Sequence, residues 1–294
     1  MSINVSIYSQ KINSNNIEYY INLFKILKKN NWNPVVYSDL KKNLIKKKIL
    51  DEKTDEFNHY KDLQSGIDLS LSIGGDGTFI ENVKFIRDSQ VPILGINTGR
   101  LGFLSNTSKN RIDESIDLIK DKKYTHQKRS LIKVDTTNNI FGEDNFAINE
   151  ITLQKKDSSS MITVHASLGE KYLNSYWADG VIVSTPSGST AYNLSCGGPI
   201  ITPGCQVHIL TPIAPHNLNV RPIVVPDHMN IKLKIEGRNR SHLISLDGKS
   251  HSIKQDDEVI IQKADYMINV IKFNDNNFLD TIRNKMNWGE DKRN

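Results

Sequence analysis

Apolar and polar positions alternate in two different ways along this chain. In the first third, short apolar runs are separated by stretches in which apolar residues recur every three or four positions. This order is typical of βαβ units around a parallel, Rossmann-like sheet. The predicted strands lie around residues 5–7, 34–37, 68–73 and 92–96, and the predicted helices over 17–30 and 78–86.

After about residue 124 the period of the pattern becomes two, and turns rich in Ser, Asn, Gly and Pro separate the apolar runs. Such spacing indicates an all-β region. Its predicted strands cover 131–134, 146–153, 161–168, 180–184, 231–235 and 258–261. A helical pattern at 280–288 is expected to return to the first domain. The sequence thus predicts an α/β domain, residues 1–124 with 275–294, and an all-β domain, residues 125–274.

Composition places the chain among ordinary globular proteins. Hydrophobic residues make up 37% and charged residues 24% of the 294 positions, and 38 basic against 33 acidic residues give a net charge of +5. This excess is too small to predict a nucleic-acid partner. The lysine-rich residues 41–48 lack interleaved aromatic residues, so we interpret them as an exposed helix face or loop.

The cysteine pattern and the start of the chain bear on location. Cys196 and Cys205 cannot build a disulfide framework, and no zinc-type or HExxH-type spacing occurs, so we assign no metal ligand. The start lacks the basic and apolar segments of a secretory leader, and no apolar run approaches the ~18 residues of a membrane span. We therefore expect a cytoplasmic protein without a membrane partner.

The residues Gly74-Gly75-Asp76-Gly77-Thr78 stand between a predicted strand and a predicted helix. Glycines let a phosphate approach the backbone without meeting a Cβ, and the N–H groups of a helix start attract anions. Thr78 is predicted to be the N-cap of the helix. The structural alternative is a glycine turn with a capping Asp. Because a carboxylate repels phosphate unless a metal ion or a proton transfer intervenes, we predict that Asp76 is catalytic.

Further polar and glycine-rich stretches accompany this loop. They are residues 97–104, the pair Asn149-Glu150, Asp179-Gly180 leading into residues 185–192, and Gly197-Gly198-Pro199. In order and spacing, the five stretches together resemble the NAD kinases. The glycine loop alone is also shared by diacylglycerol and sphingosine kinases and, more distantly, by 6-phosphofructokinases.

The resemblance implies an enzyme that transfers a phosphoryl group from ATP to the 2′-hydroxyl of the adenosine ribose of NAD, giving NADP. It implies a phosphate loop formed by Gly74, Gly75, Gly77 and Thr78. It implies NAD binding by Asp76, Gly77, Phe103, Asn149, Glu150, Asp179, Thr190, Ala191, Tyr192, Asn193, Leu194, Ser195 and Lys249. At Ser160 and Lys249 the chain departs from the residues that the family usually has. A homodimer or homotetramer through the β-rich half is also implied.

The expected mechanism follows from the weak nucleophilicity of a sugar hydroxyl at neutral pH. We expect Asp76 to take its proton as the hydroxyl oxygen attacks the γ-phosphorus, which is typically worth ~10² to 10⁴-fold. Positioning and charge neutralisation are expected to supply the rest. A divalent cation, Mg²⁺, is expected on the donor phosphates, because the glycine loop supplies dipoles but no full positive charge.

Two other functions fit parts of the sequence. A lipid kinase with the same loop would need an apolar groove or an interfacial amphipathic helix, and the predicted helices show no such pattern. A non-catalytic dinucleotide sensor would keep the pocket without turnover. The sequence leaves open ATP against polyphosphate as donor and NAD against NADH as acceptor.

Overall fold

The computed structural model describes residues 2–10, 12, 16–156, 160–274 and 277–287. The chain separates into two units, residues 1–128 with 268–294 and residues 129–267. Two long strands, β7 (Thr125–Thr136) and β18 (Val259–Lys272), cross the boundaries between them. The boundaries therefore fall inside strands, four residues after the predicted domain limit at 124 and seven residues before the one at 275.

The first unit contains the helices of the first third of the chain and the last helix. Its strands are β1 (Ile3–Tyr8), β2 (Trp32–Tyr37), β3 (Asp55–Phe57), β4 (Leu69–Ile73), β5 (Ile93–Asn97) and β6 (Thr107–Ser108). Its helices are α1 (Ile17–Lys29), α2 (Ser38–Lys46), α3 (Asp76–Ile86), α4 (Ile112–Lys120) and α6 (Phe278–Met286), with short 3₁₀ turns at Tyr60–Leu63 and Lys109–Arg111.

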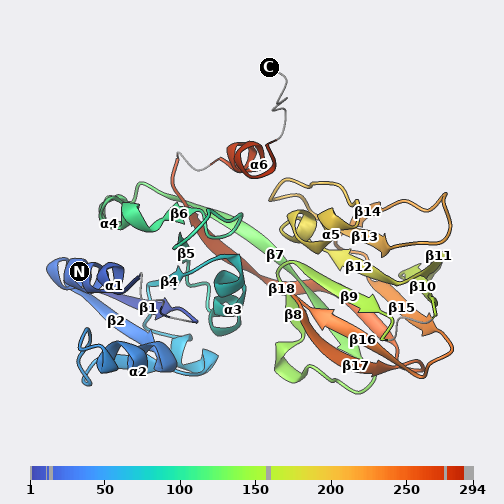
Figure 1. Cartoon of the computed structure of the whole chain (residues 1–294), viewed down its shortest axis with the longest axis horizontal. Coiled ribbons are helices and arrows are strands. Elements are labelled where there is room, and N and C mark those ends of the chain that lie inside the picture. Colours follow the sequence, from blue (N-terminus) through green and yellow to red (C-terminus); the bar gives the residue numbers. More distant parts are fainter. Residues whose placement is uncertain (1, 11, 13–15, 157–159, 275–276, 288–294) are drawn as a thin grey trace. The chain divides into compact units, whose positions relative to one another are not determined.

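These strands form one parallel sheet in the order β18, β5, β4, β1, β2, β3, with β6 beside β5. All five residues of β4 and of β5 are buried, as expected for parallel strands covered on both faces. Helices α1 and α3 lie on opposite faces of the sheet (Figure 1). This confirms the α/β prediction for the first third of the chain. The lysine-rich segment forms most of α2 and the turn after it.

The second unit is all-β. Its strands, besides parts of β7 and β18, are β8 (Phe146–Ala147), β9 (Glu150–Gln154), β10 (Ile162–Leu168), β11 (Lys171–Ala178), β12 (Gly180–Ser184), β13 (Val207–Ile213), β14 (Ile223–Pro226), β15 (Ile231–Glu236), β16 (Ser241–Leu246) and β17 (Lys249–Lys254). One helical turn, α5 (Tyr192–Ser195), interrupts them, and shorter 3₁₀ turns lie at Gly142–Asp144 and Gly188–Thr190.

Two antiparallel sheets pack face to face in this unit. One runs β11, β10, β15, β18 with β7 and β8 attached, and the other runs β14, β13, β12, β9, β16, β17. Apolar residues of both sheets, such as Val164 of β10 and Val181 of β12, belong to one buried cluster. The unit is therefore a β-sandwich with its core between the sheets.

The structure corrects three details of the sequence prediction. The strand expected over 146–153 is two strands, β8 and β9, because the backbone between them bonds to other loops instead of to a sheet neighbour. Strands β3, β6, β11, β13, β14, β16 and β17 and helix α4 were not predicted. The closing helix runs over Phe278–Met286, and Trp288 lies outside the described residues. Among the described residues, no helix is both long and apolar enough to cross a bilayer.

Candidate active site

The glycine loop joins strand β4 to helix α3. Gly74 has a φ of +156°, and a Cβ there would lie 2.3 Å from Thr78 Oγ1. Only glycine fits so close to the first turn of the helix. Gly75 and Gly77 have nothing within 4 Å of the place a Cβ would take. The loop therefore leaves bare backbone beside a helix N-terminus, an arrangement suited to phosphate.

Helix α3 begins at Asp76, and Gly75 is its N-cap residue without a side-chain cap. The prediction that Thr78 is the N-cap is therefore wrong. Thr78 is the third helical residue, and its N–H donates to Gly75 O at 3.0 Å. The tight turn at Gly74 starts the helix earlier than the pattern of apolar positions indicated. Asp76 thus stands in the first turn, where the helix dipole favours a carboxylate.

The carboxylate of Asp76 is held by the loop after β5. Phe103 N donates to Oδ2 at 2.8 Å, and Leu104 N and Ser105 N donate to Oδ1 at 3.1 and 2.8 Å. Gly102 permits this approach, because a Cβ there would lie 1.9 Å from Oδ1. A carboxylate has about four acceptor positions, and these bonds occupy three of them. The side chain is therefore fixed in orientation while Oδ2 retains acceptor capacity.

A cavity of about 180 Å³ lies beside the glycine loop. Residues at the carboxyl ends of β1 and β4 line it, and the chain leaves these strands in opposite directions, through α1 to β2 and through α3 to β5. Doubly wound sheets bind their ligands at such a switch point. The lining residues are Ser9, Gln10, Asn16, Tyr20, Ile73, Gly74, Gly75, Thr78 and Thr98.

Phe103, a predicted NAD contact, is half-buried against the C-terminal helix of the same unit. Its ring centroid lies 6.2 Å from that of Phe278, and Lys285 Nζ lies 4.7 Å from the Phe103 centroid. Both partners belong to α6. The last helix therefore supports the loop that holds Asp76.

In the second unit, Asn149 lies between β8 and β9, and Glu150 begins β9. Residues 148–150, here called the 148–150 corner, donate three successive N–H groups to one carboxylate. Ile148 N donates to Asp247 Oδ2 at 2.8 Å, and Asn149 N and Glu150 N donate to Asp247 Oδ1 at 2.8 and 3.1 Å. Asp247 and Gly248, at φ +46° and +85°, form the two-residue turn between β16 and β17, for which Asp-Gly is a preferred sequence.

The other side of the 148–150 corner is held by the segment after β12. Thr185 N donates to Asn149 O at 2.9 Å, and Thr185 Oγ1 donates to Ile148 O at 2.5 Å. A Cβ on Gly188 would lie 2.2 Å from Asn149 O. The backbone of the corner is therefore fixed from both sides, which leaves its side chains to serve a ligand.

Glu150 is 8% exposed, and its Oε2 has no hydrogen-bond partner among the described residues. Burial and the nearby charge of Asp247 raise the pKa of Glu150 to about 8, although a hydrogen bond from the Tyr192 backbone acts in the opposite direction. Glu150 is therefore mainly protonated at neutral pH. In that form its carboxyl group can both donate and accept hydrogen bonds.

The stretch Thr190–Ser195, predicted to contact NAD, ends a 3₁₀ turn and forms α5. Asn193 is fully buried, with Oδ1 accepting from Thr211 Oγ1 at 2.6 Å and Nδ2 donating to Ser189 O at 3.3 Å. Its side chain therefore fixes the local fold. The other members are accessible to different degrees: Tyr192 and Ser195 are exposed, and Thr190, Ala191 and Leu194 are half-buried.

The remaining predicted residues also lie in the second unit. Asp179 precedes β12, and its Oδ1 lies 2.6 Å from Lys155 Nζ. Lys249 is exposed at the start of β17, and Ser160 is half-buried before β10. The predicted coenzyme residues thus form two sets. Asp76, Gly77 and Phe103 belong to the first unit, and the others belong to the second.

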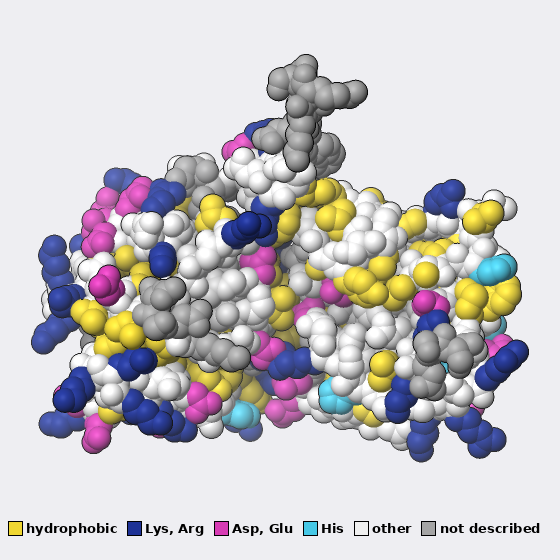
Figure 2. Space-filling model, in the orientation of Figure 1, with side chains coloured by type: hydrophobic (Ala, Val, Ile, Leu, Met, Phe, Trp, Pro, Cys, Tyr) yellow, Lys and Arg dark blue, Asp and Glu magenta, His cyan; other side chains and the backbone are white. Residues whose placement is uncertain are grey.

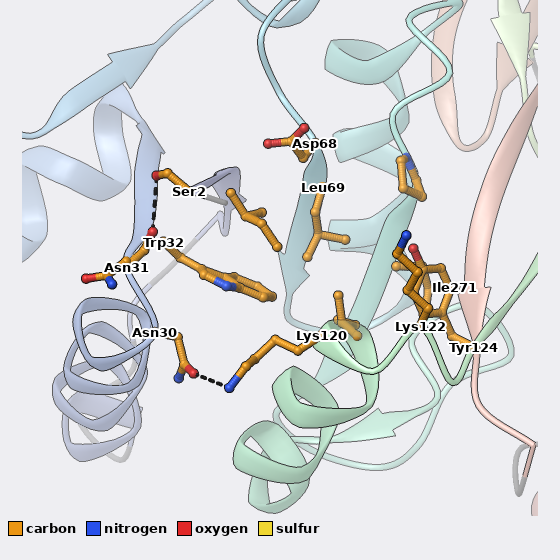
Figure 3. Close-up of a pocket in the computed structure, with 13 residues that line it drawn as sticks. Ser2, Asn30, Asn31, Trp32, Asp68, Leu69, Lys120, Lys122, Tyr124 and Ile271 are labelled. Carbon is orange, nitrogen blue, oxygen red and sulfur yellow. Dashed lines mark hydrogen bonds between the residues drawn. The ribbon is translucent and has the colours of Figure 1, made fainter.

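A larger cavity, of about 790 Å³, lies in the first unit (Figure 3). It is lined by residues at the amino ends of strands, such as Ile3, Trp32 and Leu69, and by Lys120, whose Nζ donates to Asn30 Oδ1 at 2.8 Å. The glycine loop follows the carboxyl end of β4, at the other edge of the sheet. The glycine loop and the smaller cavity therefore lie together at one edge of the sheet, and the larger cavity lies at the other edge.

The sequence alone did not predict the roles of two groups of residues. Asp247 lies in the segment Leu246-Asp247-Gly248-Lys249, which resembles the family, but its bonds to residues 148–150 span 97 to 99 positions and leave no local pattern. Ser9, Gln10 and Asn16 line the cavity beside the glycine loop only because β1 and β4 are neighbours in the sheet. A search for polar residues just after each predicted parallel strand would have found Ser9 and Gln10.

A doubly wound sheet with a bare glycine loop at its switch point, followed along the chain by a β-sandwich, indicates a protein that binds a nucleotide phosphate. Models of two domains of known proteins match the chain: the ATP-NAD kinase N-terminal domain over residues 5–124 and the ATP-NAD kinase C-terminal domain over residues 148–273. The chain belongs to the ATP-NAD kinase family. It is accordingly a phosphotransferase that acts as an NAD kinase.

Individual relatives agree with this assignment. An NAD kinase of Flavobacterium psychrophilum is 44% identical over 292 residues, which is 99% of each chain. The yeast NADH kinase complexed with NADH has the same fold, with a TM-score of 0.88 and 22% identity over 99% of this chain and 89% of that one. An Archaeoglobus fulgidus NAD kinase in complex with ATP matches with a TM-score of 0.72 and 24% identity over 98% of both chains.

Proposed function

We propose that the chain transfers the γ-phosphoryl group of ATP to the 2′-hydroxyl of the adenosine ribose of NAD and so makes NADP for NADP biosynthesis. The observation that carries the proposal is the Asp76 carboxylate, which three backbone N–H groups hold at the start of α3, beside the bare glycine backbone. The complexes of the yeast enzyme with NADH and of the archaeal enzyme with ATP support the two substrate classes.

The donor triphosphate is proposed to bind at the glycine loop and the 180 Å³ cavity. Backbone N–H groups and the dipole of α3 supply partial positive charge there. A divalent cation, Mg²⁺, is proposed to arrive with the triphosphate and to neutralise part of its charge. Within the described ranges, no three His, Cys, Asp or Glu side chains are placed to hold a metal ion, so we assign no protein ligands to it.

Asp76 is proposed to be the general base. The remaining acceptor position on Oδ2 takes the proton of the ribose hydroxyl while the hydroxyl oxygen forms its bond to the γ-phosphorus. The bond from that phosphorus to the bridging oxygen breaks, and ADP leaves with the electron pair. Because three N–H groups fix the carboxylate, little reorganisation is needed at the moment of reaction.

NAD is proposed to bind through the residues that the family resemblance indicates in both units. In the second unit, the 148–150 corner offers an amide and a neutral carboxyl group, which suit the hydroxyls of a ribose. The exposed ring of Tyr192 offers a flat surface to a base. Asn193 is proposed to act indirectly, since its amide is engaged with Thr211 and Ser189.

A cytoplasmic homodimer or homotetramer is proposed, with neither a nucleic-acid nor a membrane partner. Strand β11 lies at the end of its sheet and carries the exposed side chains of Tyr172 and Trp177, and Leu218 nearby in the same unit is 86% exposed. Figure 2 shows hydrophobic side chains on this end of the β-rich unit. An apolar edge strand is a surface that association between copies would cover.

The test is NADP formation from NAD, ATP and Mg²⁺ by the wild-type protein and by Asp76→Asn. We expect the substitution to lower kcat by about 10² to 10⁴-fold while NAD still binds, because Asn keeps an acceptor for the loop but cannot take a proton. The matched control is Asp62→Asn. Asp62 also accepts two backbone N–H groups, at 2.9 Å, but lies outside the site, so its kcat should stay unchanged. Wild-type turnover in Asp76→Asn would refute the assigned role.

A further inference from the structure

Two carboxyl groups meet at the 148–150 corner, and only one of them has its hydrogen bonds satisfied. Asp247 accepts three N–H groups from the corner. Glu150, which contributes one of those N–H groups, buries its own side chain beside Asp247 and leaves Oε2 without a partner among the described residues. A buried, unpaired carboxylate next to a second carboxylate is costly, whereas the protonated acid is not.

We propose that Asp247 is a positioning residue of the NAD pocket, which fixes the backbone of Asn149 and Glu150 and keeps the Glu150 carboxyl group protonated when it meets the coenzyme. This inference rests on the proposed function, because it takes the 148–150 corner to be part of the coenzyme site. A neutral acid avoids repulsion with the pyrophosphate of NAD. It also presents an O–H donor and a C=O acceptor, the pair that a ribose diol requires.

The groups that face Glu150 come from few elements. Asp247 belongs to the turn between β16 and β17, and Tyr192 and Cys196 belong to α5 and the residue after it. Burial raises the pKa of both the Tyr192 phenol and the Cys196 thiol, so both stay neutral near pH 8. Of the two strands beside β9, β12 has no titratable side chain, and β16 carries only His242, whose pKa burial holds below its ordinary value of 6.5. Changes of NAD binding between pH 7 and pH 9 therefore report Glu150.

The test is the dissociation constant of NAD, measured by calorimetry without ATP from pH 6 to pH 9.5. The wild-type constant is expected to rise about tenfold between pH 7 and pH 9, since ionised Glu150 binds poorly. Glu150→Gln cannot ionise, so its constant should be flat and close to the wild-type value at pH 7. Asp247→Asn removes the neighbouring charge, so the rise should begin at a lower pH than in the wild type.

A matched control is Asp257→Asn. Asp257 is also a turn carboxylate of the second unit, and it accepts from Lys254 N at 2.9 Å and from Asn138 Nδ2 at 2.7 Å. The Asp257→Asn substitution should lower the free energy of unfolding without changing how the dissociation constant of NAD depends on pH. A merely structural role for Asp247 would make the two variants alike and would overturn the inference.

Other results of the binding measurements also test the proposed roles of Asp247 and Glu150. A wild-type constant that is flat from pH 7 to pH 9 would overturn the inference while leaving NAD kinase turnover and the role of Asp76 intact. Absence of NAD binding at every pH would instead overturn the proposed coenzyme site and the inference with it. If Asp247→Asn does not fold, the comparison of Glu150→Gln with the wild type still decides whether Glu150 is the titrating group.

Discussion

Asp76 and Asp247 make the same set of contacts in two unlike surroundings. Each carboxylate accepts three successive backbone N–H groups, from residues 103–105 in the first unit and from residues 148–150 in the second. Asp76 reaches its loop from the first turn of a helix, whereas Asp247 reaches its corner from a hairpin turn at φ +46°. Two different backbone conformations therefore give the same arrangement, a carboxylate that accepts three successive N–H groups, here called a clamp.

The neighbours of each carboxylate determine what it can do besides holding a loop. Asp76 stands beside bare glycine backbone and a cavity suited to phosphate, so its remaining acceptor position can serve proton transfer. Asp247 stands beside Glu150, whose protonation it favours, and is proposed to shape the surface that binds NAD. The comparison predicts that changes around Asp76 alter turnover and that changes around Asp247 alter affinity.

The largest expected effect comes from Gly102→Ala. The new Cβ would lie 1.9 Å from Asp76 Oδ1, so the carboxylate must leave its three N–H donors. We expect kcat to fall by about 10² to 10⁴-fold, as if the base had been removed. Steady-state kinetics with saturating NAD and ATP measure this.

Gly99→Ala is the control for that substitution. A Cβ on Gly99 would meet only Asn97 Oδ1, at 3.8 Å, which is an ordinary contact. Its kcat should therefore stay within a few-fold of the wild type. Equal losses of kcat in Gly102→Ala and Gly99→Ala would mean that any substitution in this loop impairs the enzyme. The contact between Gly102 and Asp76 would then not be the cause of the loss.

The second prediction concerns the acid stability of the β-rich unit. His208 is fully buried and has no hydrogen-bond partner among the described residues, and burial lowers its pKa to about 4, partly opposed by Asp227. The folded state therefore binds fewer protons than the unfolded state between about pH 4 and 6.5. This contribution to stability is fully present above pH 6.5 and is lost as the pH falls to 4.

His208→Leu should remove this dependence. Relative to the variant, the wild type should lose on the order of 3 kcal/mol of unfolding free energy between pH 7 and pH 4. Urea unfolding at both pH values measures the difference. A difference between the two proteins that is the same at pH 7 and pH 4 would show that His208 titrates in the folded state as it does in the unfolded chain.

A smaller effect is expected from Gly188→Ala in the second unit. The added Cβ would lie 2.2 Å from Asn149 O and would push the 148–150 corner away from Thr185. We expect the dissociation constant of NAD to rise about tenfold, the effect of roughly 1.4 kcal/mol. At saturating NAD, kcat should change much less. A loss confined to kcat would contradict the division of roles between the two clamps.

The sequence predicted strands whose burial is continuous and also strands, such as β15, whose burial alternates. Strands β4, β5 and β12 are buried along their whole length, so their apolar runs stand out. Strands β11 and β17 each expose several residues, among them Lys171, Tyr172 and His251, so neither has a continuous buried run or a regular alternation of buried and exposed positions. Edge strands of this kind take their structure from pairing with a neighbour, which a local pattern does not contain.

In the candidate site, too, some features were predicted from the sequence and others were not. The glycine loop was predicted because its residues are consecutive. The two clamps were not predicted, because their hydrogen bonds join residues far apart in the sequence. Asp76 accepts from residues 27 to 29 positions away, and Asp247 accepts from residues 97 to 99 positions away. Thr78 was predicted as an N-cap from its residue type, but the close approach of Gly74 begins the helix before it.

The most direct test measures kcat and the dissociation constant of NAD at pH 8 for Asp76→Asn and Asp247→Asn side by side. We expect Asp76→Asn to lower kcat by about 10² to 10⁴-fold with NAD binding nearly unchanged. We expect Asp247→Asn to weaken NAD binding several-fold with kcat nearly unchanged at saturating NAD. Equal losses of kcat in both variants, or weaker NAD binding in both, would contradict the different roles assigned to Asp76 and Asp247.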